Sequence, residues 1–93
     1  QMEGVGFAEQ GEAWKDVEAG RTERDGDLPI NTSGGLKSKG HPLGASGVAQ
    51  GYEIYKQLVD EAGARQVEAD VGLACNVGGF GNCVITTIME ANA

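Results

Sequence analysis

The chain has 93 residues, with 14 acidic and 7 basic side chains and a formal net charge of −7. This length suits one domain and excludes a large self-contained enzyme, and the acidic balance argues against nucleic acids and anionic membrane surfaces as partners. The two cysteines cannot form the disulfide framework of a small secreted domain, and there is no secretory leader pattern and no apolar run long enough to span a membrane. We therefore expect a cytoplasmic protein.

A short helix is predicted over residues 10–19, where Trp14 and Val17 lie three positions apart and share one face. Gly20 suits the position just past the end of that helix. The next segment is charged and turn-rich and belongs on the surface. A brief extended stretch is expected over 28–30, because the proline there disfavours helix for the residue before it.

Residues 31–47 read NTSGGLKSKGHPLGASG and hold many of the 16 glycines. This segment has too little apolar periodicity for a helix or strand, so we expect a structured loop. Ser46 is expected to cap a longer helix that runs to Ala62 and stops at Gly63. The apolar positions of this helix follow helical spacing: Val48, Tyr52, Tyr55, Leu58 and Val59.

Two apolar runs, over 71–77 and 83–89, predict strands joined by the tight glycine-rich connection 78–82. The second run is rich in β-branched residues, which favour strands. Strands that are this continuously apolar are usually covered on both faces. A chain of 93 residues has little else with which to cover them.

His41 is the single histidine and lies in the segment GHPLG at the entrance to the long predicted helix. A lone histidine in a loop is often a structural or surface residue. Pro42 and the flanking glycines restrict the backbone here, however, and an imidazole can act as a base near neutral pH. Both interpretations of His41 stay open on these grounds.

Cys75 lies at the end of the first predicted strand, directly before the sequence Asn76-Val77-Gly78-Gly79. A buried strand cysteine is commonly an inert small hydrophobe, whereas a thiol at a strand end can transfer protons or attack a substrate if its surroundings favour the thiolate. Cys83, inside the second run, is expected to be structural. No metal site is expected, because His41 and the cysteines lack the spacing of a metal-binding motif.

The segment GGLKSKG invites a phosphate-binding interpretation, but it lacks the spacing G-x-x-x-x-G-K-[ST]. The segment GGFG precedes a strand and not a helix, which argues against a dinucleotide fingerprint. Lys37 and Lys39 are expected to be solvated or paired with the acidic excess. That excess fits either solubility or adaptation to high salt.

The combination of segments is more specific than its parts. SGGLKSKGHPLGASG, a long helix, a strand, CNVGGFG and a final strand together resemble the C-terminal end of thiolases, in particular the archaeal and sterol-carrier-protein-related branch. The resemblance covers residues 4–91, with 8–15 following it loosely. It implies an α/β, thiolase-like fold in which residues 1–93 are a partial C-terminal domain. This domain would be the last portion of the second βαβαβαββ half, a mixed sheet with covering helices.

Thiolases catalyse Claisen condensation of acyl-CoA or thiolysis of 3-oxoacyl-CoA. The resemblance implies that His41 activates a nucleophilic cysteine and helps to form an oxyanion hole, and that Cys75 moves the proton of the acetyl carbon that becomes a carbanion. Many members of the branch carry histidine at the position of Cys75. Val77 stands where the family's C-x-G motif has glycine, and it still supplies a backbone N–H. The implied loop-positioning residues are Gly40, Pro42, Gly44, Gly78 and Gly79.

The family's acylated nucleophile lies in the N-terminal half, and neither cysteine of this chain matches its motif. The resemblance therefore implies a fragment or small subunit that is inactive alone and that works in an oligomer with a thiolase N-terminal portion or larger subunit. Its substrates would be coenzyme A thioesters, with no further cofactor. A non-catalytic docking module of an acyl-CoA complex and part of a thiolase-like retro-aldolase remain the alternatives.

Overall fold

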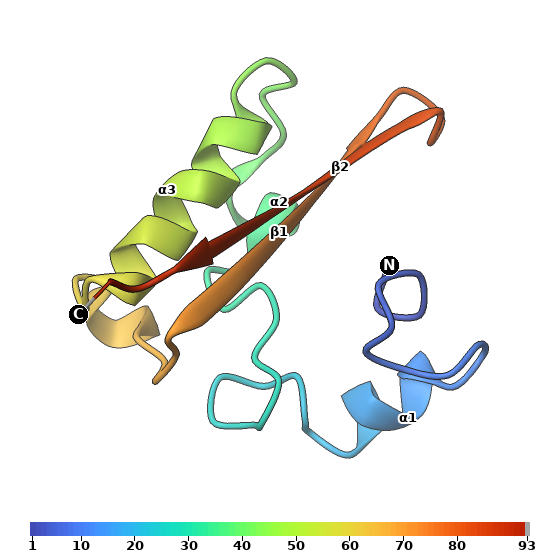
Figure 1. The fold of residues 1–93 in the computed structure, drawn as a ribbon, viewed down its shortest axis with the longest axis horizontal. Coiled ribbons are helices and arrows are strands. Elements are labelled where there is room, and N and C mark those ends of the chain that lie inside the picture. Colours follow the sequence, from blue (N-terminus) through green and yellow to red (C-terminus); the bar gives the residue numbers. More distant parts are fainter. Residues whose placement is uncertain (93) are drawn as a thin grey trace. The chain divides into compact units, whose positions relative to one another are not determined.

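The computed structural model describes residues 1–92, which divide into an N-terminal unit, Gln1–Thr32, and a C-terminal unit that starts at Ser33. Figure 1 shows the elements in chain order: α1 (Ala13–Glu18), α2 (Gly35–Lys39), α3 (Ser46–Leu58), the 3-10 helix η1 (Gly63–Arg65), β1 (Val71–Gly78) and β2 (Cys83–Glu90). Helices with a small sheet agree with the expected α/β class. The single partial domain over residues 1–93 stays a prediction. No helix in the described part of the chain is both long and apolar enough to cross a membrane.

The N-terminal unit contains the predicted first helix, α1, shortened at both ends. Its C-terminus is closed as the sequence predicts, with Gly20 in the left-handed region at φ 80. The Gly20 N–H donates to the Val17 carbonyl at 3.1 Å, and the Arg21 N–H donates to the Asp16 carbonyl at 3.0 Å. These two bonds are those of a Schellman motif, which satisfies carbonyls that the helix end would otherwise leave free.

The charged segment after α1 is organised around Arg21. Its guanidinium donates to Asp27 at 2.9 Å and to Asp16 at 2.7 Å. The bond to Asp27 is the first cause that raises the pKa of Arg21, and the same bond lowers the pKa of the Asp27 carboxyl. Because Arg21 and Asp27 are exposed, the bond between them orders a surface turn and contributes little to stability.

The segment expected to be loop contains one short helix, α2, so that expectation was wrong for residues 35–39. Gly34 and Gly40 flank this helix with φ angles of 91 and 86. Such angles favour glycine because it lacks a Cβ atom. A helix this short offers no apolar periodicity, which explains why the sequence pattern did not predict it.

The helix α3 confirms the longer predicted helix but ends earlier than expected. Asp60, not Gly63, takes the left-handed position after the helix, with φ 59. The Asp60 N–H donates to the Gln57 carbonyl at 3.3 Å, and the Glu61 N–H donates to the Lys56 carbonyl at 2.9 Å. Aspartate tolerates this conformation better than most side chains, and Gly63 instead opens η1.

The side chain of Gln57 ties the end of α3 to the chain that follows it. Its amide donates to the Arg65 carbonyl at 2.9 Å and accepts from the Val67 N–H at 2.8 Å. Beside it, Arg65 holds both carboxylate oxygens of Glu53, at 3.0 and 3.1 Å. That ion pair is the first cause of a lowered pKa for Glu53. The path from α3 to β1 is therefore fixed largely by polar contacts.

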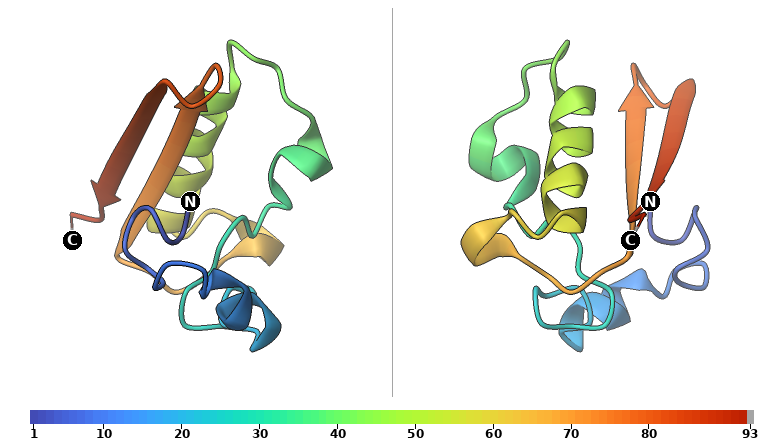
Figure 2. Two further views of the ribbon diagram at one scale, coloured as in Figure 1. Left: turned by 90° about the vertical axis from the view of Figure 1, so that its right-hand side faces the viewer. Right: turned by 60° about the vertical axis from the view of Figure 1, so that its left-hand side comes forward.

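The two predicted strands are confirmed as an antiparallel hairpin. Its register runs from Val71 opposite Glu90 to Gly78 opposite Cys83. Figure 2 shows α3 along one face of this hairpin, and the contact is more extensive with β1 than with β2. At the closest approach, a Cβ atom on Gly72 would lie 2.5 Å from Ile54 Cγ2.

The other face of the hairpin is apolar and has no cover within residues 33–92. Side chains alternate between the two faces of a strand. Because Gly72 faces α3, its neighbours in β1 face the opposite side. Val71 is 55% exposed and Ile88 of β2 is 66% exposed. Ala62, at 3%, is the one buried apolar residue in the described chain. This exposure is what the sequence predicted for two apolar strands with little else to cover them.

The contact between Gly72 and Ile54 generates a paired test of the packing. Gly72→Ala should lower the free energy of unfolding by about 1–3 kcal/mol, because its Cβ overlaps a stiff side chain. Gly51→Ala, inside α3, should raise that free energy by about 0.5–1 kcal/mol, because a Cβ there meets nothing within 4 Å. Urea unfolding followed by circular dichroism measures both. Equal effects for the two variants would contradict the described approach of α3 to β1.

Candidate functional site

His41 lies in the turn between α2 and α3, and backbone hydrogen bonds close this turn. Gly40, with φ 86 and ψ 176, directs the chain out of α2. The carbonyl of Pro42 then accepts the N–H groups of Ala45 at 2.8 Å and Ser46 at 3.0 Å. The turn is therefore closed by backbone hydrogen bonds, and the exposed His41 lies on it next to the N-terminus of α3.

Ser46 contacts the histidine directly and does not cap α3, so the capping expectation was wrong. Ala45 takes the N-cap position and no side chain caps the helix. The buried hydroxyl of Ser46 lies 2.6 Å from His41 Nδ1 and donates to the Pro42 carbonyl at 3.2 Å. The sequence pattern did not predict this role. The one sign of it in the sequence is the short interval of GHPLGAS, which ends on a hydroxyl five residues after the histidine.

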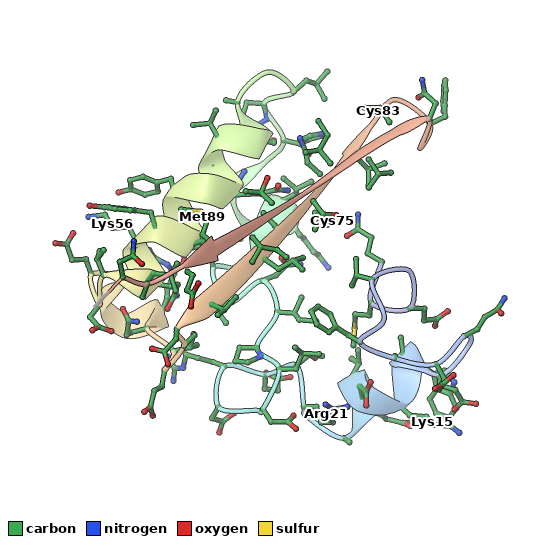
Figure 3. The ribbon with its side chains drawn as sticks, viewed as in Figure 1. Lys15, Arg21, Lys56, Cys75, Cys83 and Met89 are labelled. Carbon is green, nitrogen blue, oxygen red and sulfur yellow. The ribbon has the colours of Figure 1, made fainter. Side chains whose placement is uncertain are left out.

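Cys75 lies on the face of β1 that points away from α3. It is opposite Thr86 of β2 and is half-buried. Figure 3 places it midway along the hairpin, with Cys83 at the tip, where that thiol is exposed. Among the described residues, Cys75 and His41 share no hydrogen bond. Two separate elements thus present the two predicted catalytic side chains.

Gly47, which follows Ser46, lies against Asn76, which follows Cys75, and this contact links the two elements. A Cβ atom on Gly47 would lie 2.9 Å from Asn76 Nδ2, so the first turn of α3 rests against the β1 residue next to Cys75. Small side chains leave a cavity of about 180 Å³ beside this contact. It is lined by Gly47, Gln50, Gly51, Ala74, Asn76, Ile85 and Thr87.

The glycine-rich connection has a steric requirement at Gly79. Its φ is 57, and a Cβ there would lie 2.7 Å from Asn82 Oδ1. Val77 lies inside β1 opposite Val84, and Gly78 ends the strand and accepts the N–H of Gly81 at 3.1 Å. Gly44, in the histidine turn, has open space around it and no positive φ, so nothing in the local structure requires glycine there.

The ion pairs of the C-terminal unit gather toward the C-terminal end of α3. Lys56 bonds Glu61 at 2.9 Å, which is the first cause of a raised lysine pKa. The Glu53–Arg65 pair lies on the same part of the helix, whereas Ser46 begins it. No group of three or more histidine, cysteine or carboxylate side chains that could hold a metal ion comes together within residues 1–92.

The sequence has close relatives among known proteins. It matches the family model described as thiolase C-terminal domain-like over residues 1–91. It is 54% identical over 90 residues to an acetyl-CoA acetyltransferase of Methanothermobacter thermautotrophicus, covering 96% of this chain and 24% of that protein. Bovine sterol carrier protein 2 is 48% identical over 89 residues, covering 95% of this chain and 16% of that protein.

These matches extend over nearly the whole chain and define the C-terminal region of a thiolase-type protein. The chain belongs to the thiolase C-terminal domain-like family. The resemblance to the archaeal and sterol-carrier-protein-related branch is thereby confirmed, as is the thiolase-like fold class. An acetyl-CoA acetyltransferase of Methanocaldococcus jannaschii, 45% identical over 95 residues, is a further archaeal relative. The chain spans 24% or less of the length of each of these three relatives.

The contact between Gly47 and Asn76 generates a double-mutant test of the link between the two elements. Ala is favoured over Gly inside a helix by about 0.5–1 kcal/mol. In the Asn76→Ala background, where the obstructing amide is gone, Gly47→Ala should therefore stabilise the chain. In the wild-type background the same substitution should stabilise less or destabilise, because its Cβ meets the amide. Urea unfolding of the four variants gives the coupling, and a value near zero would contradict the contact.

Proposed function

We propose that this chain is the C-terminal part of a thiolase-type acyltransferase that acts on coenzyme A thioesters. The reaction is Claisen condensation of acyl-CoA or, in reverse, thiolysis of 3-oxoacyl-CoA. The observation that carries the proposal is the GHPLGASG turn, with His41 held against Ser46, in a chain 54% identical over 90 residues to an acetyl-CoA acetyltransferase.

In this function His41 and Cys75 act on different atoms. His41 takes the proton of a nucleophilic thiol, which then attacks the thioester carbonyl. The resulting N–H donates a hydrogen bond to the oxygen where negative charge develops. Cys75, as a thiolate, removes a proton from the acetyl carbon of the second substrate, and Val77, two residues further along β1, supplies a backbone N–H. The lack of a hydrogen bond between His41 and Cys75 suits this division of roles.

The nucleophilic thiol would come from another polypeptide, a thiolase N-terminal portion or larger subunit. Two observations support this partner. The apolar hairpin face has no cover within residues 33–92, with Ile88 66% exposed, and the archaeal acetyl-CoA acetyltransferase is about four times the matched length, since the match covers 24% of it. We place the resulting oligomer in the cytoplasm. Its acid–base steps use side chains and coenzyme A thioesters and need no further cofactor.

Native mass spectrometry of the chain purified from its source tests the partner. We expect a stable complex with a chain of about two to three times its length, the size of the missing part of a two-half fold. Salt should match the source conditions, because the acidic surface makes association salt-dependent. A chain found only alone or with copies of itself would contradict the partner. The catalytic roles of His41 and Cys75 would then describe a longer parent protein and not this chain.

Substitution of the two catalytic candidates tests the chemistry in the assembled protein. His41→Ala and Cys75→Ala should each lower turnover of acetyl-CoA or 3-oxoacyl-CoA by about 10²–10⁴-fold, the usual contribution of a general acid or base. Cys83→Ala is the matched control, because Cys83 is an exposed thiol at the hairpin tip, and it should leave turnover unchanged.

The same variants separate the proposal from its alternatives. Unchanged turnover in an intact His41→Ala assembly would contradict the catalytic role and favour a docking module. Cleavage of a β-hydroxyacyl thioester, without condensation or thiolysis, would identify a retro-aldolase instead. Mass spectrometry of each variant confirms that the assembly is intact, so a loss of turnover cannot come from a loss of the partner.

A further inference from the structure

Ser46 has the most buried side chain in the described part of the protein, at 2% exposed. Its hydroxyl is not used to cap α3, which has no side-chain cap. The hydroxyl is directed instead at an exposed imidazole, with Oγ 2.6 Å from His41 Nδ1. A buried polar group aimed at a candidate catalytic base indicates a role beyond helix formation.

The hydrogen-bonding capacity of Ser46 determines which nitrogen of His41 carries the hydrogen. A serine hydroxyl has one hydrogen, and a carbonyl oxygen only accepts. The 3.2 Å contact with the Pro42 carbonyl is therefore a bond that Ser46 donates. Its single hydrogen is then used, so the 2.6 Å contact requires Nδ1–H to donate to Ser46 Oγ. The opposite assignment would leave two acceptor oxygens facing each other with no hydrogen between them.

The carbonyl of Pro42 also holds the serine in place. The same oxygen accepts the N–H groups of Ala45 and Ser46, at 2.8 and 3.0 Å. The backbone turn that positions His41 therefore also fixes the hydroxyl that bonds to the imidazole.

We propose that Ser46 is a positioning residue for His41: it holds the neutral imidazole in the tautomer protonated at Nδ1 and leaves the Nε2 lone pair free. This inference deepens the proposed acyltransferase function and rests on it. Nε2 needs its lone pair to take the proton of the nucleophilic thiol, and it then becomes a donor to the thioester oxygen. Ser46 accepts from Nδ1–H in both states, so the ring keeps one orientation through both steps.

The chain suits a direct test, because His41 is its only histidine. Nitrogen NMR of the chain labelled at the histidine ring, at a pH where imidazole is neutral, reports which nitrogen carries the hydrogen. We expect the Nδ1–H tautomer to dominate in the wild type and to lose that dominance in Ser46→Ala. Ser38→Ala is the matched control, an exposed serine of α2 without a hydrogen bond to His41, and it should leave the tautomer unchanged.

Turnover in the assembled protein supplies the functional readout. Ser46→Ala should lower kcat by about 10–100-fold, by analogy with groups that orient metal-bound imidazoles, whose removal typically has an effect of that size. KM for the thioester should change little, because the Ser46 hydroxyl is buried and its contacts are with His41 and Pro42. Ser46→Thr, which keeps the hydroxyl, should restore part of the loss, whereas Ser38→Ala should behave as the wild type.

Several results would overturn the inference. A wild-type imidazole protonated at Nε2 would do so without any variant, which keeps the test decisive even if Ser46→Ala failed to fold. An unchanged tautomer in folded Ser46→Ala, or a changed tautomer with unchanged kcat, would do so as well. If the wild-type assembly shows no turnover at all, the proposed function fails. The tautomer measurement would still decide whether Ser46 orients His41.

Discussion

The close approach of α3 to one face of the hairpin is the contact on which the rest of the C-terminal unit depends. Two glycines permit it: Gly72 in β1 lies under Ile54, and Gly47 in α3 lies under the Asn76 amide. These contacts fix which face of β1 meets the helix. Because side chains alternate along a strand, a slip of one residue would turn Cys75 toward α3 and exchange the two faces of the hairpin. The register therefore determines which face of the hairpin carries the Cys75 thiol.

The sequence predicted those parts of the structure that rest on periodicity or on a recognisable motif. The apolar spacing of α3 and the two apolar runs of the hairpin were sufficient to predict the helix and the two strands, and GHPLG and CNVGG singled out His41 and Cys75. The sequence did not predict features that depend on single backbone angles, such as the end of α3 at Asp60. The contact of Ser46 with His41 was also missed, because only the closed turn makes the two residues neighbours.

The apolar face of the hairpin has an energetic consequence. Apolar surface left in water forgoes about 25 cal/mol per Å², and the described chain has a single buried apolar residue, Ala62. An open edge beside such a face can also pair with other strands, which natural proteins normally prevent by covering it. The C-terminal unit is thus organised internally by polar contacts and glycine-mediated packing, while its largest apolar surface suits association with another part of a larger fold.

The contacts that orient the two candidate catalytic side chains all lie inside the C-terminal unit. His41 is held by Ser46 and the Pro42 carbonyl, and the hairpin register and its packing against α3 fix the direction of Cys75. A partner that covers the hairpin therefore has no need to create the orientation of either group. In the function proposed above, that partner would supply the nucleophile and exclude water from a site whose two acid–base groups this unit already orients. Preorganisation of this kind lowers the reorganisation required in the reaction itself, which makes a short chain with a prearranged histidine and thiol a physically reasonable part of a divided active site.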